Sequence, residues 1–156
     1  MRRIAILAGA LAALAGCGSD TSPETPTACL APATDYLSAL QDAPGQVRLA
    51  GTTPISGCLV EEQASGPLQT VGKSVIDAAT ELNRQVRRDP GSPAAVRLGY
   101  LVGAVQEAAT STGGIHQDLV LRLDSAARYT GPEKKPFPAA FEREYGRGYA
   151  AGQQDG

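Results

Sequence analysis

The sequence predicts an all-α domain, a bundle of four or five helices with one disulfide-clipped loop near its N-terminal end. Three observations lead to this fold class. Apolar residues recur at spacings of three and four along most of the chain. Proline, glycine and short polar residues separate these periodic segments, as they do where helices start and stop. Patterns typical of strands are short, and glycine and proline interrupt them.

The first 16 residues have the layout of a secretory signal peptide. Arg2 and Arg3 precede an uncharged apolar stretch, 4–15, which is too short to span a bilayer as a helix. The stretch ends in Leu14-Ala15-Gly16-Cys17, which resembles the lipobox of bacterial lipoproteins. This resemblance implies cleavage before Cys17 and attachment of a diacylglyceryl group to its thiol. A lipid on Cys17 would anchor the domain on the extracytoplasmic side of the cell membrane or of an outer membrane.

Residues 17–28 are expected to form a tether between the lipid and the domain. Positions 18–27 are polar, contain two prolines and have no apolar residue to bury. Ten extended residues reach about 33–36 Å. The helical domain is expected to cover 29–152.

One pair of cysteines, Cys29 and Cys58, is left once Cys17 is lipidated. An exported protein meets an oxidising environment, so we expect these two residues to form a structural disulfide. The loop of about 29 residues would contribute roughly 3–4 kcal/mol in the chain-entropy model. A redox or metal site would need a C-x-x-C motif or further cysteine and histidine at close spacing, which the sequence lacks.

The domain begins with a short predicted helix and an irregular segment. Thr34 is the expected N-cap of a helix over 34–40, and Pro44-Gly45 lies beyond its end. Val47 and Leu49 alternate as in a strand, but the rest of 46–58 breaks any long element.

The strongest helix is predicted over 65–88. Ser65 and Pro67 mark its start, and Asp89-Pro90-Gly91 marks its end. Six apolar residues form one stripe at helical spacing: Leu68, Val71, Val75, Ala79, Leu82 and Val86. Arginines near its C-terminal end suit the helix dipole and need no anionic ligand.

A third helix is predicted over 93–109, with Ser92-Pro93 at its start. Gly99 and Gly103 lie four residues apart inside it. Arg97 and Glu107 are too close together to bracket a membrane span. We therefore expect the two glycines to face a neighbouring helix of the bundle.

Two further helices complete the pattern. The stripe of the fourth is Ile115, Leu119, Val120, Leu123, Ala126 and Ala127. The fifth begins near Pro138 and places Phe141, Tyr145 and Tyr149 on one side. We expect these aromatic residues to dock the last helix onto the bundle. The alternative is that they face an apolar or peptide ligand.

Charge excludes some partners. Without residues 1–16 the chain has 14 − 2 = 12 basic and 16 acidic residues, a net charge of −4, and its basic residues form no stripe. A nucleic-acid or anionic-lipid surface needs a concentrated basic face. The expected membrane contact is therefore the lipid anchor alone, and no nucleic acid is expected as a partner.

His116 is the only histidine and the first candidate for chemistry. A catalytic role requires a nucleophile and an orienting carboxylate close to it in space. Ser111 and Asp118 are near in sequence, but no motif fixes them into a triad. A packing or capping role is the simpler interpretation, and we expect no metal and no cofactor.

These observations predict a membrane-anchored cell-envelope protein with a non-catalytic domain, a scaffold or binding module that meets an envelope protein. The alternative is a small ligand carrier or hydrolase-like enzyme with a site near His116 and the aromatic last helix. A cavity that combines His116, a carboxylate and an aromatic residue would favour the alternative.

Overall fold

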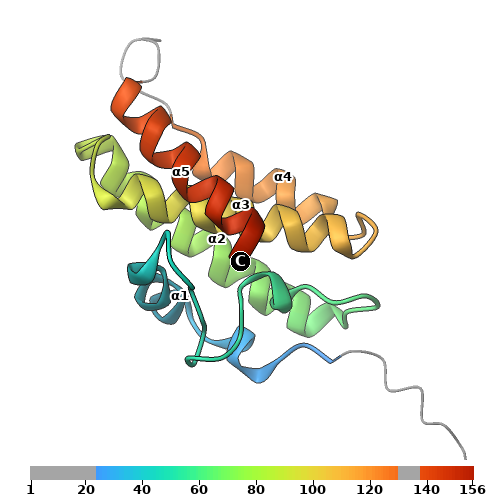
Figure 1. Ribbon diagram of the computed structural model, residues 1–156. Helices are drawn as coiled ribbons and strands as arrows, with labels where there is room; N and C mark the ends of the chain where they lie inside the picture. The colour runs from blue at the N-terminus through green and yellow to red at the C-terminus, as the bar shows by residue number, and fades with distance from the viewer. Residues whose placement is uncertain (1–23, 130–137) are drawn as a thin grey trace, which may run out of the picture.

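The computed structural model describes residues 24–129 and 138–156, and within them the chain is all-α. Five α-helices are present in these ranges (Figure 1). They are α1 (Ala33–Ala39), α2 (Ser65–Arg88), α3 (Pro93–Ser111), α4 (Gln117–Ala127) and α5 (Ala139–Asp155). Three short 3₁₀ helices lie near the N-terminal end: η1 (Thr27–Leu30), η2 (Leu40–Asp42) and η3 (Ser56–Cys58). The predicted fold class is confirmed.

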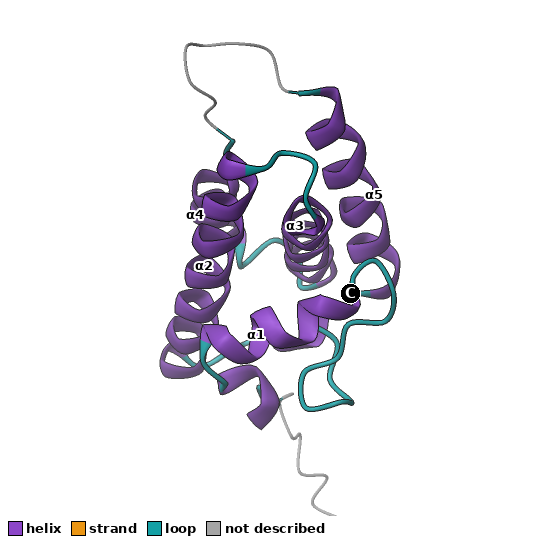
Figure 2. Cartoon of the chain, turned by 90° about the vertical axis from the view of Figure 1, so that its left-hand side faces the viewer, coloured by secondary structure: helices purple, strands orange, loops and turns teal. Residues whose placement is uncertain are grey.

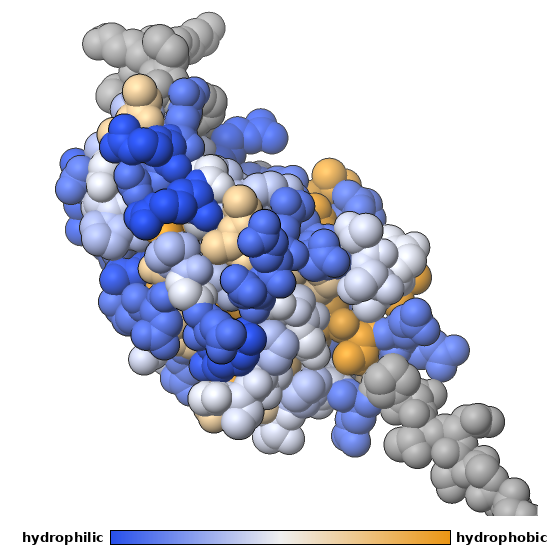
Figure 3. Space-filling model, in the orientation of Figure 1, coloured by the Kyte–Doolittle hydropathy of each residue, from blue (hydrophilic) through white to orange (hydrophobic). Residues whose placement is uncertain are grey.

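The helix α3 lies in the middle of the bundle. In Figure 2, α2 and α4 cover one side of α3, α5 covers the other, and α1 crosses below. Every residue from Leu98 to Val105 is buried, as expected for a helical segment without charged residues that has neighbours on several sides. The outer helices carry the polar residues, and the face shown in Figure 3 is mainly hydrophilic.

The apolar stripe of α2 faces this core. Val75, Leu82 and Val86 are among its fully buried side chains, and they pack in one cluster with Leu101, Val105, Leu119 and Leu123. Leu68 is partly buried at the edge of the same cluster. The helical periodicity therefore identified the inward face correctly.

Helices α3 and α5 meet through their backbones. Gly99 and Gly103 of α3 face the backbone at Tyr145 and Tyr149, as predicted for a neighbouring helix. A Cβ atom built on Gly99 would lie 2.8 Å from the backbone nitrogen of Tyr149. The relation is reciprocal, because Gly148 and Gly152 of α5 face the backbone of α3.

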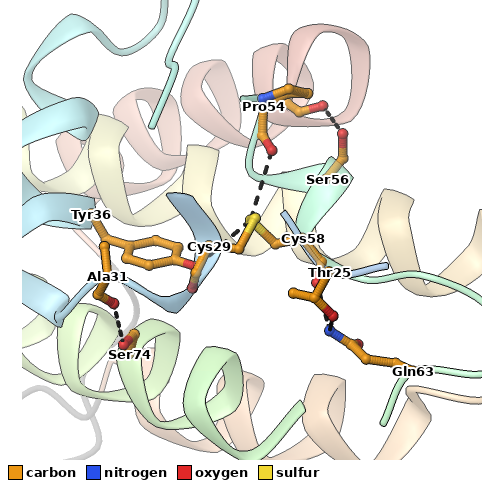
Figure 4. The surroundings of a disulfide bond; sticks show 10 residues. Thr25, Cys29, Ala31, Tyr36, Pro54, Ser56, Cys58, Gln63 and Ser74 are labelled. Carbon is orange, nitrogen blue, oxygen red and sulfur yellow. Dashed lines mark hydrogen bonds between the residues drawn. A yellow bond between two sulfur atoms is a disulfide. The ribbon is translucent and has the colours of Figure 1, made fainter. Parts of the chain in front are cut away.

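A disulfide closes the N-terminal loop, as predicted (Figure 4). Cys29 and Cys58 have a Cα–Cα distance of 5.3 Å and are both buried. The buried hydroxyl of Tyr36 donates a hydrogen bond to the carbonyl oxygen of Cys29 at 2.8 Å. Ser74 of α2 donates to the carbonyl oxygen of Ala31 at 2.8 Å, which fixes this loop to the bundle.

Thr25 extends the packed domain beyond its expected start. Its side chain is buried, and Gln63 donates a hydrogen bond to its hydroxyl at 2.8 Å. The last residues of the segment expected as a tether therefore pack on the domain. At the other end α5 continues to Asp155, past the expected boundary at residue 152.

Two local expectations were wrong, and one was confirmed. The N-cap of α1 is Pro32, and the Thr34 hydroxyl bonds instead to the Asp35 carboxylate. Leu49 forms only an isolated bridge with Thr53, so 46–58 contains no long element, as expected, and the described residues contain no strand. Ile115 precedes α4 and is 60% exposed, because the chain is still turning there and has no inward face.

Candidate functional site

A groove of about 1090 Å³ lies along the outer side of α2. Three parts of the chain form it: the segment from η1 into α1, the first half of α2, and the connection from α3 into α4. We call it the α2 groove and define it by its main lining residues, which are Leu30, Ala33, Leu68, Ile76, Ile115, His116 and Leu119.

His116 enters the groove wall through a reversal of the chain. Gly113 and Gly114 have φ angles of +69° and +79°, a conformation that favours glycine. The reversal brings His116, the N-cap residue of α4, back to Thr112 at the end of α3. The imidazole Nδ1 lies 2.8 Å from the Thr112 hydroxyl oxygen, and His116 is only 2% exposed.

The hydrogen bonds of Thr112 favour one tautomer of His116. The Thr112 hydroxyl has one proton, and it donates that proton to the carbonyl oxygen of Ala108 at 2.9 Å. With that proton on Ala108, the Thr112 oxygen accepts the hydrogen bond from His116, an arrangement that favours the tautomer with the proton on Nδ1. Burial lowers the pKa of His116 and favours this neutral ring.

Nε2 of His116 is consequently a buried acceptor. Among the described residues no group bonds to it. The other buried polar side chain of the groove wall, Ser74, already donates to Ala31. An unmade hydrogen bond at a buried polar atom is unfavourable, and Nε2 is also closed to water in this structure.

The charges along the groove are paired with each other. Lys73 binds Asp77 one turn further along α2, and Arg122 Nη1 lies 3.9 Å from Asp118 Oδ2 on α4. All four side chains are at least half exposed. Two acids and two bases leave the rim of the groove without an uncompensated charge.

The aromatic residues of α5 lie elsewhere. Phe141, Tyr145 and Tyr149 form a ladder with ring centroids 5.3 and 6.2 Å apart. Phe141 also stacks on Tyr129 at 5.1 Å. A smaller hollow of about 430 Å³ lies beside Phe141 and Tyr145, and His116 does not line it. The structure therefore separates His116 from the aromatic last helix.

This ladder docks α5 on the bundle, as its spacing predicted. Phe141 belongs to the buried core, and Tyr145 and Tyr149 pack against that core. The Tyr149 hydroxyl donates to Gln106 of α3 at 2.5 Å. Burial raises the pKa of Tyr145 and keeps its hydroxyl protonated.

The neighbours of His116 in sequence do not join it. Ser111 donates its hydroxyl proton to the carbonyl oxygen of Ala108 at 3.0 Å, and Asp118 pairs with Arg122. The described residues contain no group of three or more His, Cys, Asp or Glu side chains arranged for a metal ion. They also contain no helix long and apolar enough to cross a membrane. Cys17 lies outside the described residues.

Comparisons with family models, with curated proteins and with solved structures give no match for this chain. The interpretation of the site therefore depends on its geometry. Sequence reasoning singled out His116 but missed its partner Thr112. The signal for this pair was the four-residue spacing across Gly113-Gly114, a turn that returns the chain toward the end of the preceding helix.

Proposed function

We propose that this protein is a lipid-anchored cell-envelope protein whose helical domain is a non-catalytic binding module. Its ligand-binding surface is the α2 groove. The arginines and the apolar stretch of residues 1–16, followed by the lipobox-like Leu14-Ala15-Gly16-Cys17, support the anchor. Two acyl chains on Cys17 would give stable membrane attachment.

The α2 groove is the single observation that carries the binding function. Its volume of about 1090 Å³ is slightly above the range of about 300–1,000 Å³ in which proteins bury small ligands. Gly72 forms part of its floor, where a Cβ atom would lie 3.3 Å from the side chain of Leu119. Because α2 and α4 already meet below the groove, the space above them is open to a ligand.

The anchor is tested by labelling intact cells with an alkyne-bearing fatty acid. The wild-type chain should incorporate the label, and the N-terminal peptide should begin at Cys17 with a diacylglyceryl group. The variant Cys17→Ser should incorporate none. Mass spectrometry that finds an unmodified wild-type N-terminus, cleaved elsewhere, would contradict the anchor.

The binding surface is tested by photo-crosslinking from defined positions in intact cells. Gln69 is exposed and lines the α2 groove, whereas Gln154 is exposed on α5 and lies outside it. A photoreactive residue at position 69 should give adducts that the same residue at position 154 does not give. Equal yields at the two positions, or none at either, would refute the groove as the binding surface.

A further inference from the structure

We propose that the α2 groove binds an acyl chain of the diacylglyceryl group on Cys17 of the same molecule whenever the protein is outside a bilayer. The inference rests on the proposed function, both the lipid anchor and the groove as the binding surface, and it names the occupant of the groove. Three features support this occupant: the place where the tether meets the domain, the aliphatic wall of the groove, and the pairing of its charges.

The tether meets the domain at one end of the groove. The side-chain amide of Gln63 donates a hydrogen bond to the Thr25 hydroxyl at 2.8 Å (Figure 4). Gln63 lies two residues before Ser65, where α2 and its part of the groove wall begin. From Thr25 the chain continues through η1 to Leu30, which also lines the groove. The segment that would carry the lipid is therefore held beside the groove.

The tether is long enough for a lipid on Cys17 to reach along the groove. Seven residues, 17–23, precede Glu24, the first described residue, and they span at most about 23–25 Å. The part of α2 that lines the groove, 65–77, is about 18 Å long at 1.5 Å per residue. A short flexible link of this kind keeps the acyl chain at a local concentration on the order of millimolar.

The wall of the groove is aliphatic and partly uncovered. Leu30 and Ile115 line it and are 39% and 60% exposed, two of the three exposed large hydrophobic residues of the described chain. Leu68, Ile76 and Leu119 continue this surface, and none of the described residues that line the groove is aromatic. On the face shown in Figure 3 the most hydrophobic atoms lie on the right-hand side, where α2 begins in Figure 1. An alkyl chain on this wall would remove apolar surface from water, which is favourable by about 25 cal/mol per Å².

The charged residues of the groove wall favour an uncharged occupant. Lys73 pairs with Asp77, and Arg122 lies 3.9 Å from Asp118. A diacylglyceryl group has ester and thioether linkages and no charge, so it leaves both pairs intact. A fatty-acid carboxylate or an anionic headgroup would find no unpaired cation among these four residues.

The groove and a bilayer compete for the acyl chain. Transfer of an acyl chain from water into a bilayer is favourable by about 0.8 kcal/mol for each CH₂ group. The groove is open to solvent along one side and covers the chain only in part, so it stabilises the chain less than a bilayer does but more than water does. The groove is therefore occupied in the protein that has left a membrane, where the domain shields its own lipid from water.

The experiment uses the full chain from cells fed with a fatty acid that carries a diazirine and an alkyne. The lipidated protein is placed in buffer without detergent, irradiated and digested, and mass spectrometry locates the label on Cys17 and the adducts on the domain. We expect the adducts to concentrate on Leu30, Ile115 and 65–77. Added phosphatidylcholine vesicles should remove these adducts, because the bilayer is the stronger acceptor of the acyl chain.

Ile115 and Leu121 provide matched variants. They are 60% and 61% exposed, but only Ile115 lines the groove. Ile115→Gln should lower the vesicle concentration that halves the groove adducts by about tenfold, the order of effect of losing the burial of one aliphatic side chain. Leu121→Gln should leave this concentration unchanged. Both side chains are exposed, so neither change opens a cavity in the core.

A mixing experiment distinguishes the molecule's own lipid from that of a second copy. The photoreactive lipidated protein is irradiated with an equal amount of ¹⁵N-labelled chain 17–156 that carries Cys17→Ser, which keeps every residue of the core. The groove adducts should form on the unlabelled chain. Equal adducts on the two chains would assign the groove to the lipid of another copy and overturn the inference.

Two other results would also overturn it. If Cys17 carries the label but the adducts spread evenly over the domain or are absent from it, the groove does not hold the acyl chain, while the anchor stands. If Cys17 carries no label, the anchor itself fails. The crosslinking comparison of positions 69 and 154 tests the groove as a binding surface separately from both.

Discussion

Replacing Gly148 by alanine should separate α5 from α3 and destabilise the domain. A Cβ atom at this position would lie 2.7 Å from the carbonyl carbon of Val96 and 3.0 Å from the backbone nitrogen of Tyr100. These are backbone atoms of the central helix α3, so they cannot move aside by a side-chain rotation. Ordinary van der Waals contact begins at 3.4 Å, and the carbonyl oxygen of Val96 would lie nearer still than its carbon. Helix α5 must therefore retreat by more than about 0.7 Å, the difference for the carbonyl carbon alone.

The magnitude follows from two opposing effects. A gap of 0.5–1 Å between α3 and α5 would lose about a quarter to a half of the energy of each dispersion contact. Overpacking of a tight interface costs about 3 kcal/mol at the upper end of its usual range. Alanine recovers about 1 kcal/mol through its higher helix propensity. The net loss is at least about 2 kcal/mol in the free energy of unfolding, which corresponds to a decrease in Tm of at least about 4–8 °C.

Gly146 provides the matched control. It lies on the same helix, and a Cβ atom there has nothing within 4 Å. Gly146→Ala should therefore raise stability by about 0.5–1 kcal/mol. Thermal and urea unfolding followed by far-UV circular dichroism measures both variants. If Gly148→Ala is as stable as Gly146→Ala, the backbone contact between α3 and α5 is absent and the reasoning fails.

Three other predictions address the core, the disulfide and pH. Leu82 is 1% exposed, so Leu82→Ala should lower the free energy of unfolding by about 2–5 kcal/mol in urea titrations; a loss below 1 kcal/mol would mean that the site is not in the core. Reduction of the Cys29–Cys58 disulfide should lower the free energy of unfolding by about 3–4 kcal/mol. The far-UV circular dichroism spectrum should stay helical, because α2 to α5 lie C-terminal to the disulfide-closed loop, and loss of the helical spectrum in non-denaturing buffer would refute this. Burial lowers the pKa of His116 from 6.5, so the unfolded chain binds the proton more readily and stability should fall as pH drops below about 6.5. In His116→Gln this decrease should be absent, and equal pH profiles for the two proteins would contradict it.

The sequence was most informative where structure is local. Ser65 and Pro67 at the start of α2 and Asp89-Pro90-Gly91 at its end act on their own neighbourhood, and the helix runs between them as predicted. The disulfide could also be predicted from the sequence, because the lipidation proposed for Cys17 leaves two cysteines and no choice of pairing. Neither inference needs knowledge of how the helices are arranged.

The α2 groove could not be predicted in the same way. Its walls come from three segments, and no pattern within one segment shows how far it stands from the next. Ile115 fits the period of α4 but precedes Gln117, where that helix begins. Thr112 was placed in a loop because the third helix was expected to end at 109; α3 continues to Ser111 and puts Thr112 within reach of His116.

The central position of α3 has a consequence for the order of assembly. A chain made from its N-terminus completes 93–111 well before 139–155 exists. During that interval the flank of α3 that contains Gly99 and Gly103 lacks the helix that packs against it. Packing of α5 against α3 is then the last step of folding. A chain that stops before residue 139 would leave this flank of α3 exposed to other nascent chains.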